Sequence, residues 1–229
     1  QDRRSDCYRP NGKQLAFHQL SATERMLRAG NQQGKTHCVG AEMAMHALAW
    51  YPEWFQGRKF LVPPKIERPY DFIGWYGCTT SGKTRDGAQV KLLGDIRIDG
   101  GFGTGLIPLD NIIGRPTMNR GISDFVDSIL LRREIGGIAV LRGKTFEMGR
   151  EAWQGEPVDV GWGDEDPGDF EIYGELQARL TTTNGVIVWS MTPMIGLSPV
   201  RKHFKTKSPG TAEVLMTIDD AAASRGGHI

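Results

Sequence analysis

The sequence predicts an α/β fold in which a mainly parallel central β-sheet is flanked by helices. Short apolar runs alternate along the chain with longer helix-like segments, a pattern typical of α/β proteins. The run 186–189, Val-Ile-Val-Trp, is apolar at every position, as expected for a strand buried on both faces. A loop of the phosphate-binding type also lies between a short apolar run and a long helix-like segment. The length of 229 residues suits one large domain.

The first half of the chain predicts one long helix and one clear strand. Residues 36–50 are rich in Ala and Met and stop before Pro52, which indicates a helix that ends there. Residues 70–76 are aromatic and β-branched and indicate a strand, followed by a weaker helix over 86–93. Residues 97–116 are rich in Gly and Pro, so we expect a long surface loop without regular structure.

The second half of the chain predicts a compact series of strands and helices. The segments 138–141 and 145–148, joined by Arg-Gly-Lys, suggest a β-hairpin. The remaining expected elements are strands over 158–163 and 186–189 and helices over 171–180 and 199–205.

Composition excludes several classes of protein. Lys and Arg number 28 against 27 Asp and Glu, so the net charge of +1 argues against a uniformly basic DNA-coating protein. No run approaches the roughly 18 apolar residues of a membrane helix, and the charged start, residues 1–6, is no signal peptide. The absence of an initiator Met suggests a fragment or a trimmed chain. The three isolated cysteines indicate reduced thiols in a cytosolic compartment. The sequence has no CxxC, no HExxH and no clustered His, which argues against a structural zinc site.

Two loops of the phosphate-binding type compete. Residues 29–36, Ala-Gly-Asn-Gln-Gln-Gly-Lys-Thr, carry Ala in place of the first Gly, whereas residues 77–84 match GxxxxGK[ST] strictly. In such a loop small residues let backbone N–H groups wrap a phosphate, while the Lys reaches the β and γ phosphates and the Thr joins the Mg²⁺ shell. The second loop follows the better strand and the first precedes the longer helix. The pattern alone leaves open which loop binds phosphate, and we expect that at least one of the two does not.

An acidic run follows an apolar strand further along the chain. Residues 160–166 read Val-Gly-Trp-Gly-Asp-Glu-Asp, so that Asp164 and Glu165 come at the strand's end. One carboxylate there could enter a Mg²⁺ shell and the other could activate water, although a solvated acidic turn would give the same pattern. Combined with a phosphate loop, the pair favours an enzyme that hydrolyses a nucleoside triphosphate.

A series of short motifs accompanies the first loop in a fixed order. Upstream of 30–36 lie Pro10 and residues 13–18; downstream follow Trp153-Gln154-Gly155, residues 163–167, Arg179-Leu180, residues 185–193 and Gly196. In their order and chemistry these motifs resemble the large terminase subunits of tailed bacteriophages, over roughly residues 8–204. The resemblance implies a P-loop NTPase fold of the ASCE or RecA-like kind.

The resemblance also implies roles for single residues. Residues 30–36 are similar to a divergent Walker A loop that would bind ATP, and Gln14 resembles an adenine-reading glutamine. The implied nucleotide-binding residues are Gln14, Gly30, Asn31, Gln32, Gln33, Gly34, Lys35 and Thr36. Thr36 and Asp164 would hold Mg²⁺, with Lys35 and Glu165 catalytic. Ser190 and Thr192 resemble the Ser-Ala-Thr coupling motif of helicases.

The resemblance also bears on the roles of Arg150 and Lys83. Many members of the family carry an Arg where this chain has Asn31, so a positive charge would have to come from Arg28, Arg150 or a neighbouring subunit. We assign Arg150 to the catalytic set on this ground. The loop at 77–84 falls where the family has a polar turn and helix, so Lys83 is interpreted as an ordinary loop lysine.

The function implied by the resemblance is that of an ATP-driven motor, which moves double-stranded DNA into a procapsid in the host cytoplasm. Its expected partners are DNA, the portal protein and the small terminase subunit. Copies of the chain would form a ring on the capsid, whereas an isolated copy could be a monomer. No membrane would be involved. Residues 1–229 would form one motor domain, with a small C-terminal subdomain from about 208 as an option and no nuclease domain.

The DNA contact is expected on a local basic patch, because the net charge is close to zero. Arg201, Lys202, Lys205 and Lys207 could neutralise phosphates without reading bases, although a solvated helix end would look the same. Two other functions stay open: a helicase-like ATPase stimulated by nucleic acid, and a nucleotide-binding assembly module with little turnover of its own.

Overall fold

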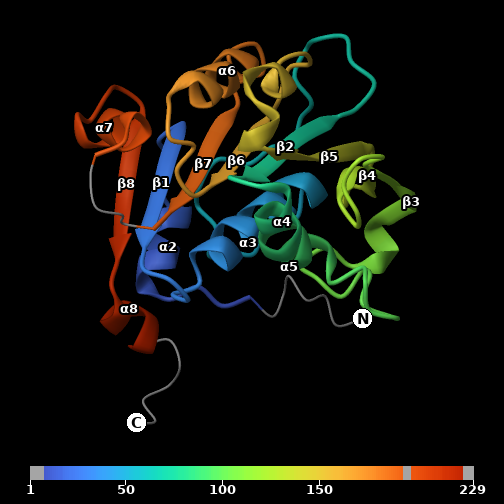
Figure 1. The fold of residues 1–229 in the computed structure, drawn as a ribbon, viewed down its shortest axis with the longest axis horizontal. Coiled ribbons are helices and arrows are strands. Elements are labelled where there is room, and N and C mark those ends of the chain that lie inside the picture. Colours follow the sequence, from blue (N-terminus) through green and yellow to red (C-terminus); the bar gives the residue numbers. More distant parts are fainter. Residues whose placement is uncertain (1–7, 193–196, 224–229) are drawn as a thin grey trace.

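The computed structural model describes residues 8–192 and 197–223, and an eight-stranded sheet forms its centre (Figure 1). The strands lie in the order β3-β4-β5-β2-β6-β7-β1-β8. All neighbours from β5 to β8 in this order are parallel, whereas β3 with β4 and β4 with β5 are antiparallel. The predicted α/β fold with a mainly parallel sheet is therefore confirmed.

The strands are short and mostly buried. Their bounds are β1 Glu24–Ala29, β2 Phe72–Cys78, β3 Ile112–Met118, β4 Val126–Arg132, β5 Ile138–Thr145, β6 Val160–Asp164, β7 Val186–Met191 and β8 Thr211–Met216. The three strands β2, β6 and β7 are buried at every residue. This matches the apolar runs in the sequence.

The helices lie on both faces of the sheet (Figure 1). They are α2 Gly12–His18, α3 Lys35–Leu48, α4 Ser81–Lys83, α5 Val90–Leu93, α6 Glu171–Leu180, α7 Pro199–Lys205 and α8 Ile218–Ala223. A π-helical segment, Thr84–Gln89, joins α4 to α5, and short 3₁₀ helices span Leu109–Asn111, Phe146–Met148 and Arg150–Trp153. Helices α6 and α7 match the predicted ranges residue for residue.

Two hydrophobic cores separate the helices by face, because successive strand residues point to opposite sides. On one face Leu27 of β1 packs with side chains from α2, α3 and α5. On the other face its neighbour Met26 packs with side chains from α6 and α7. The sheet is therefore a middle layer, and the loops at the carboxyl ends of its strands are exposed at one edge.

The predicted hairpin at 138–148 is wrong. Strand β5 runs straight through Arg142-Gly143-Lys144, where it pairs with β2 on one side and β4 on the other. A Cβ atom on Gly143 would lie 2.4 Å from the Val126 carbonyl oxygen, so this glycine permits a close approach of β4 instead of forming a turn. Residues 146–148 form a 3₁₀ helix.

Two boundary predictions also need correction. The loop expected over 97–116 contains a 3₁₀ turn and the first part of edge strand β3. Helix α3 ends at Leu48, because Ala49 adopts the left-handed conformation with φ 53°. Strand β8 pairs in parallel with β1, so residues 211–216 form an edge strand of the main sheet.

Replacement of Gly143 by Ala is expected to destabilise the fold by about 1–3 kcal/mol, because the new methyl group overlaps the β4 backbone. Gly174 in α6 is the matched control: a Cβ there would meet only the Phe170 ring, at 4.0 Å. Gly174→Ala should instead stabilise by up to about 1 kcal/mol through helix propensity. Urea unfolding of both variants measures the difference, and an equal effect would contradict this packing.

Candidate functional site

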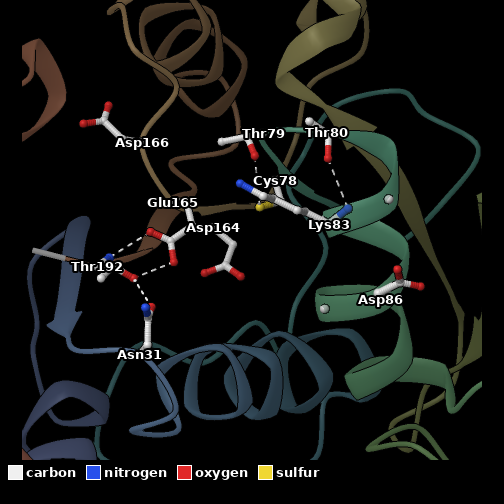
Figure 2. Close-up of a pocket in the computed structure, with 12 residues that line it drawn as sticks. Asn31, Cys78, Thr79, Thr80, Lys83, Asp86, Asp164, Glu165, Asp166 and Thr192 are labelled. Carbon is white, nitrogen blue, oxygen red and sulfur yellow. Dashed lines mark hydrogen bonds between the residues drawn. The ribbon is translucent and has the colours of Figure 1, made fainter. Parts of the chain in front are cut away.

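A cavity of about 780 Å³ opens at the carboxyl ends of the central strands (Figure 2). Its lining residues are Asn31, which follows β1; Cys78 to Thr80, Gly82, Lys83, Asp86 and Gly87 around the end of β2; Asp164 to Asp166 at the end of β6; and Thr192 after β7. Open parallel sheets bind ligands in the crevice outside these strand ends. The sheet order thus gathers four loops, distant in sequence, around one space.

The first phosphate-loop candidate forms the turn between β1 and α3. Gln32 and Gly34 have positive φ values of 59° and 81°, which curl the backbone before α3 begins. The Gln33 side-chain Oε1 accepts a hydrogen bond of 2.9 Å from the Gly30 N–H. The Gln14 side-chain nitrogen lies 3.4 Å from the Gly34 carbonyl oxygen, to which it donates. The loop is therefore held from within and from α2.

Lys35 and Thr36 begin α3 and turn toward the two acidic residues at the end of β6. The Lys35 Nζ lies 3.0 Å from Glu165 Oε1, and the Lys35 side chain is only 8% exposed. The Thr36 hydroxyl donates to Asp164 Oδ2 at 3.1 Å. The first loop is thus in contact with the Asp-Glu pair.

Asp164 lies in a buried hydrogen-bond chain. The Ser190 hydroxyl donates to Asp164 Oδ1 at 2.5 Å and accepts from the Trp162 indole N–H at 3.0 Å. Parallel pairing of β6 with β7 sets Asp164 opposite Ser190. Burial raises the pKa of Asp164 to about 6, and the Glu165 charge adds to this, while hydrogen bonds from Ser190 and Thr36 and the Lys35 ammonium oppose it.

Glu165 is held by both neighbouring loops. Its Oε2 accepts from the Thr192 backbone N–H at 2.9 Å, and its Oε1 accepts from the Thr192 hydroxyl at 2.7 Å. The same hydroxyl lies 3.2 Å from Asn31 Oδ1 in the phosphate loop. Burial raises the pKa of Glu165, but the Thr192 hydrogen bonds and Lys35 outweigh it and lower the pKa below its usual value. Glu165 is therefore a charged acceptor aimed into the cavity.

The backbone at Glu165 is unusual. Its φ of 73° lies in the left-handed region, which is uncommon for a residue with a side chain. Two bonds hold this conformation: the Glu165 N–H donates to the Ser190 carbonyl oxygen, and the Trp189 indole N–H donates to the Glu165 carbonyl oxygen. The Trp189 ring lies over Gly163, where a Cβ atom would come within 2.3 Å. Glycine at 163 is thus required to place Glu165.

The residues at the phosphate loop suit a Mg²⁺ ion that is bound partly by phosphates. Thr36 and Asp164 supply the hydroxyl and carboxylate oxygens that Mg²⁺ prefers, and they lie side by side. Over residues 8–192 and 197–223, no group of three or more His, Cys, Asp or Glu side chains forms a complete metal site.

The second loop, at 77–84, has a different structure. Gly77 and Cys78 are extended residues of β2, and Thr80 caps the following helix by accepting from the Lys83 N–H at 3.2 Å. The Thr84 hydroxyl, which would have to reach a metal, accepts from the Cys78 N–H at 2.8 Å and donates to the Lys144 carbonyl at 3.1 Å. This segment therefore lacks the phosphate-loop shape. Its Lys83 nevertheless lines the cavity, which sequence reasoning missed.

Several predicted site residues lie elsewhere. Arg150 is not brought to the cavity: it lies on the 3₁₀ helix before β6 and pairs with Glu175 of α6 at 2.7 Å. Arg28 pairs with Glu213 of β8 at 2.5 Å. Gln14 is 7% exposed, and its Oε1 accepts from the Asn11 N–H at 3.0 Å, so its amide is engaged within the protein.

The basic patch predicted for DNA is on and just after α7, which packs against the sheet face opposite α3. Lys202, Lys205 and Lys207 are exposed and Arg201 is half-buried. His203 of α7 lies 2.7 Å from Glu24 at the start of β1, which fixes the helix to the sheet. Pro193 and Gly196 of the expected coupling region lie outside the described residues.

Within the described part of the chain, no helix is long and apolar enough to cross a membrane. No protein-family model matches the sequence. Among known sequences, the chain is 30% identical over 217 residues to the large terminase subunit of Salmonella phage P22. The match covers 86% of this chain and 41% of the P22 subunit, so the chain spans about two fifths of that relative.

Solved structures of large terminases share the fold of this chain. The ATPase domain of the Thermus phage P74-26 large terminase matches with a TM-score of 0.66 and 16% identity, covering 97% of this chain and 86% of that one. The large terminase of the thermophilic bacteriophage D6E, solved in complex with ADP, matches with a TM-score of 0.63 and 12% identity, covering 93% and 46%. The resemblance predicted from the sequence is confirmed: the chain is related in sequence to a phage large terminase subunit and has the fold of large terminase ATPase domains.

Proposed function

We propose that the chain is the ATP-hydrolysing motor domain of a viral DNA-packaging terminase, which couples hydrolysis to the translocation of double-stranded DNA into a procapsid. One observation carries the proposal. The phosphate loop at 30–36, the Asp-Glu pair and Thr192 form one connected network at the carboxyl ends of β1, β6 and β7. A phosphate loop joined to two carboxylates in different environments suits metal-assisted hydrolysis of a triphosphate.

ATP binding is assigned to the loop between β1 and α3. The backbone N–H groups of residues 32–36 and the Lys35 ammonium would hold the β and γ phosphates. Gln14 would support the loop from the side through its contact with Gly34. Thr36 and Asp164 would hold Mg²⁺, whose charge neutralises the phosphate oxygens when it is bound.

Hydrolysis is assigned to Glu165. Its lowered pKa keeps the carboxylate charged, so that it can orient a water molecule and accept its proton as the water oxygen attacks the γ-phosphorus. The bond from this phosphorus to the bridging oxygen breaks, which leaves ADP and inorganic phosphate. Lys35 forms an ion pair with Glu165 in the structure. Lys35 would therefore have to leave Glu165 before it could bind the phosphates.

Coupling is assigned to Ser190 and Thr192. Ser190 fixes Asp164 from β7, and Thr192 contacts both the catalytic Glu165 and Asn31 of the phosphate loop. Loss of the γ-phosphate would change these contacts at the end of β7. The chain then leads to α7, whose basic side chains Arg201, Lys202 and Lys205, with Lys207 beyond it, are the proposed DNA contacts.

The proposed partners are DNA, the portal protein and the small terminase subunit, in the host cytoplasm. With a net charge of +1, one copy should hold DNA weakly and in a salt-sensitive way. A strong grip would then require several copies in a ring. The chain spans about two fifths of the P22 subunit, so the nuclease activity of other terminases is not assigned to it.

The proposal is tested by ATP turnover of a Lys35→Ala variant, measured as phosphate release in Mg²⁺ with and without long duplex DNA. We expect turnover to fall by about 10²-fold or more, because the phosphates lose their buried cation. The exposed Lys65 provides the control, and Lys65→Ala should match the wild type. Wild-type turnover in Lys35→Ala would reject this loop as the ATP site.

A further inference from the structure

The site just described has one cation on the phosphate loop and four acidic residues around the cavity. Lys35 is that cation, and Asp86, Asp164, Glu165 and Asp166 are the acids. Negative charge spreads over the γ-phosphate oxygens as phosphoryl transfer proceeds, and NTPases stabilise it with a further cation. Arg28 and Arg150, expected in that role, pair with Glu213 and Glu175 and do not line the cavity.

Lys83 lines the same cavity, on the side opposite Asn31 and Thr192 (Figure 2). Figure 2 shows its side chain extending from α4 across the opening, toward the ends of β2 and β6, where Glu165 lies. The sheet order explains the position: β2 is the direct neighbour of β6, and Cys78 pairs with Asp164 in register. A residue that follows β2 by one helical turn therefore projects over the acidic pair.

The backbone that carries Lys83 is firmly held. Its N–H donates to the Thr80 hydroxyl, and the Ser81 N–H donates to Glu147 Oε1 at 2.7 Å. Thr84 is buried and ties the same turn to β2 and β5 through its hydroxyl. Lys83 thus lies on a fixed turn. A group that binds a ligand at a defined position needs such a rigid support.

Among residues 8–192 and 197–223, the Lys83 ammonium forms no ion pair with the carboxylates that share its cavity. Asp86, the acid nearest in sequence, is engaged by Arg85 at 3.0 Å and Arg97 at 2.8 Å. Asp164 and Glu165 are held by Ser190, Thr36, Lys35 and Thr192. The charge of Lys83 therefore remains available to a ligand in the cavity.

We propose that Lys83 contacts the γ-phosphate of ATP bound at residues 30–36 and stabilises its negative charge during transfer, a catalytic role supplied by the chain itself. The inference rests on the proposed function. Lys83 exchanges no proton in the reaction: Glu165 takes the proton of the attacking water, and the ammonium only balances charge on the γ oxygens. Lys35 and Lys83 would then hold the phosphate from two sides.

The first test compares Lys83→Ala, Lys83→Arg and the control Lys91→Ala in phosphate release with Mg²⁺ and long duplex DNA. Lys91 is exposed on α5, in the same helical segment, and lines a different cavity. We expect kcat to fall by about 10²-fold in Lys83→Ala, with KM little changed. Lys83→Arg should recover much of the rate, and Lys91→Ala should keep it. Wild-type kcat in Lys83→Ala would overturn the proposal.

The second test does not depend on turnover. Lys83→Ala should weaken binding of ADP with aluminium fluoride and Mg²⁺, which mimics the transferring phosphoryl group, by at least tenfold. Binding of a non-hydrolysable ATP analogue should change less than threefold. Equal weakening of both ligands would mean a ground-state contact only and would reject the catalytic role. If Lys35→Ala is inactive while Lys83→Ala passes both assays unchanged, the proposed function stands and this inference alone fails.

Discussion

Replacement of Glu165 by Gln is expected to leave ATP binding intact and to slow hydrolysis by about 10²–10⁴-fold. The amide keeps the size of the side chain and can still contact Thr192, but it cannot accept the proton of the attacking water. It also removes the ion pair with Lys35, which frees the ammonium for the phosphates. Nucleotide affinity should therefore be equal to the wild type or higher. Binding measured by calorimetry and turnover measured by phosphate release separate the two effects.

The exposed Glu53 supplies the control for this variant. Glu53→Gln makes the same chemical change far from the network and should leave both binding and turnover unchanged. Thr192→Val adds a second comparison, because it removes the hydroxyl contacts to Glu165 and Asn31 while keeping the backbone bond. If Glu165→Gln hydrolyses ATP at the wild-type rate, Glu165 is not the base.

Replacement of Glu42 by Gln is expected to destabilise the protein by about 3–5 kcal/mol. Glu42 of α3 is fully buried and lies 2.5 Å from Arg25 of β1, 2.7 Å from His18 and 3.2 Å from His46. Removing the carboxylate charge leaves Arg25 buried without its counter-charge. Since small proteins are stable by only about 5–15 kcal/mol, such a loss should be evident in urea unfolding.

A double variant distinguishes a lost charge from lost packing. Arg25→Met with Glu42→Leu removes both ions of this pair and should cost much less than Glu42→Gln alone, because no guanidinium is left buried without its counter-charge. Equal destabilisation by the single and double variants would show that the ion pair itself is not the cause.

The effect of Glu42 should depend on pH in a defined direction. Burial raises its pKa, but Arg25, His18 and His46 outweigh burial and hold the pKa well below the ordinary value of 4.5. A carboxyl group with a lowered pKa contributes its full stability above the unfolded value and loses it as the pH falls through the folded one. The stability difference between the wild type and Glu42→Gln should therefore be largest near neutral pH and shrink in acid.

The sequence predicted those parts of the fold that depend on local signals. Helix α7 has the predicted bounds, and local features stabilise it: Ser198 caps it and Pro199 begins it. Strand β7 was evident because every position is apolar. The Asp-Glu pair and the phosphate loop were likewise local patterns, and the structure brings them into contact.

What the sequence missed depends on which strands are neighbours. Gly143 lies in an Arg-Gly-Lys segment that is typical of a turn. In the structure it lies in β5 between β4 and β2, where the absence of a side chain lets the β4 backbone come close. The family resemblance predicts a polar turn and helix around Lys83 and so gives this residue no role, but β2 lies beside β6 and brings it to the cavity. The Arg25–Glu42 pair was missed because its members are far apart in sequence. Such contacts follow from the order of the strands, which no short motif encodes.

The central claim is that the phosphates of ATP lie in the loop at 30–36, against Asp164 and Glu165. A crystal structure of the chain with Mg²⁺ and a non-hydrolysable ATP analogue tests it most directly. We expect the β and γ phosphates at the N–H groups of residues 32–36 and at Lys35, with the metal at Thr36 and Asp164. Phosphates bound at residues 79–84, with Lys35 still paired to Glu165, would contradict the account.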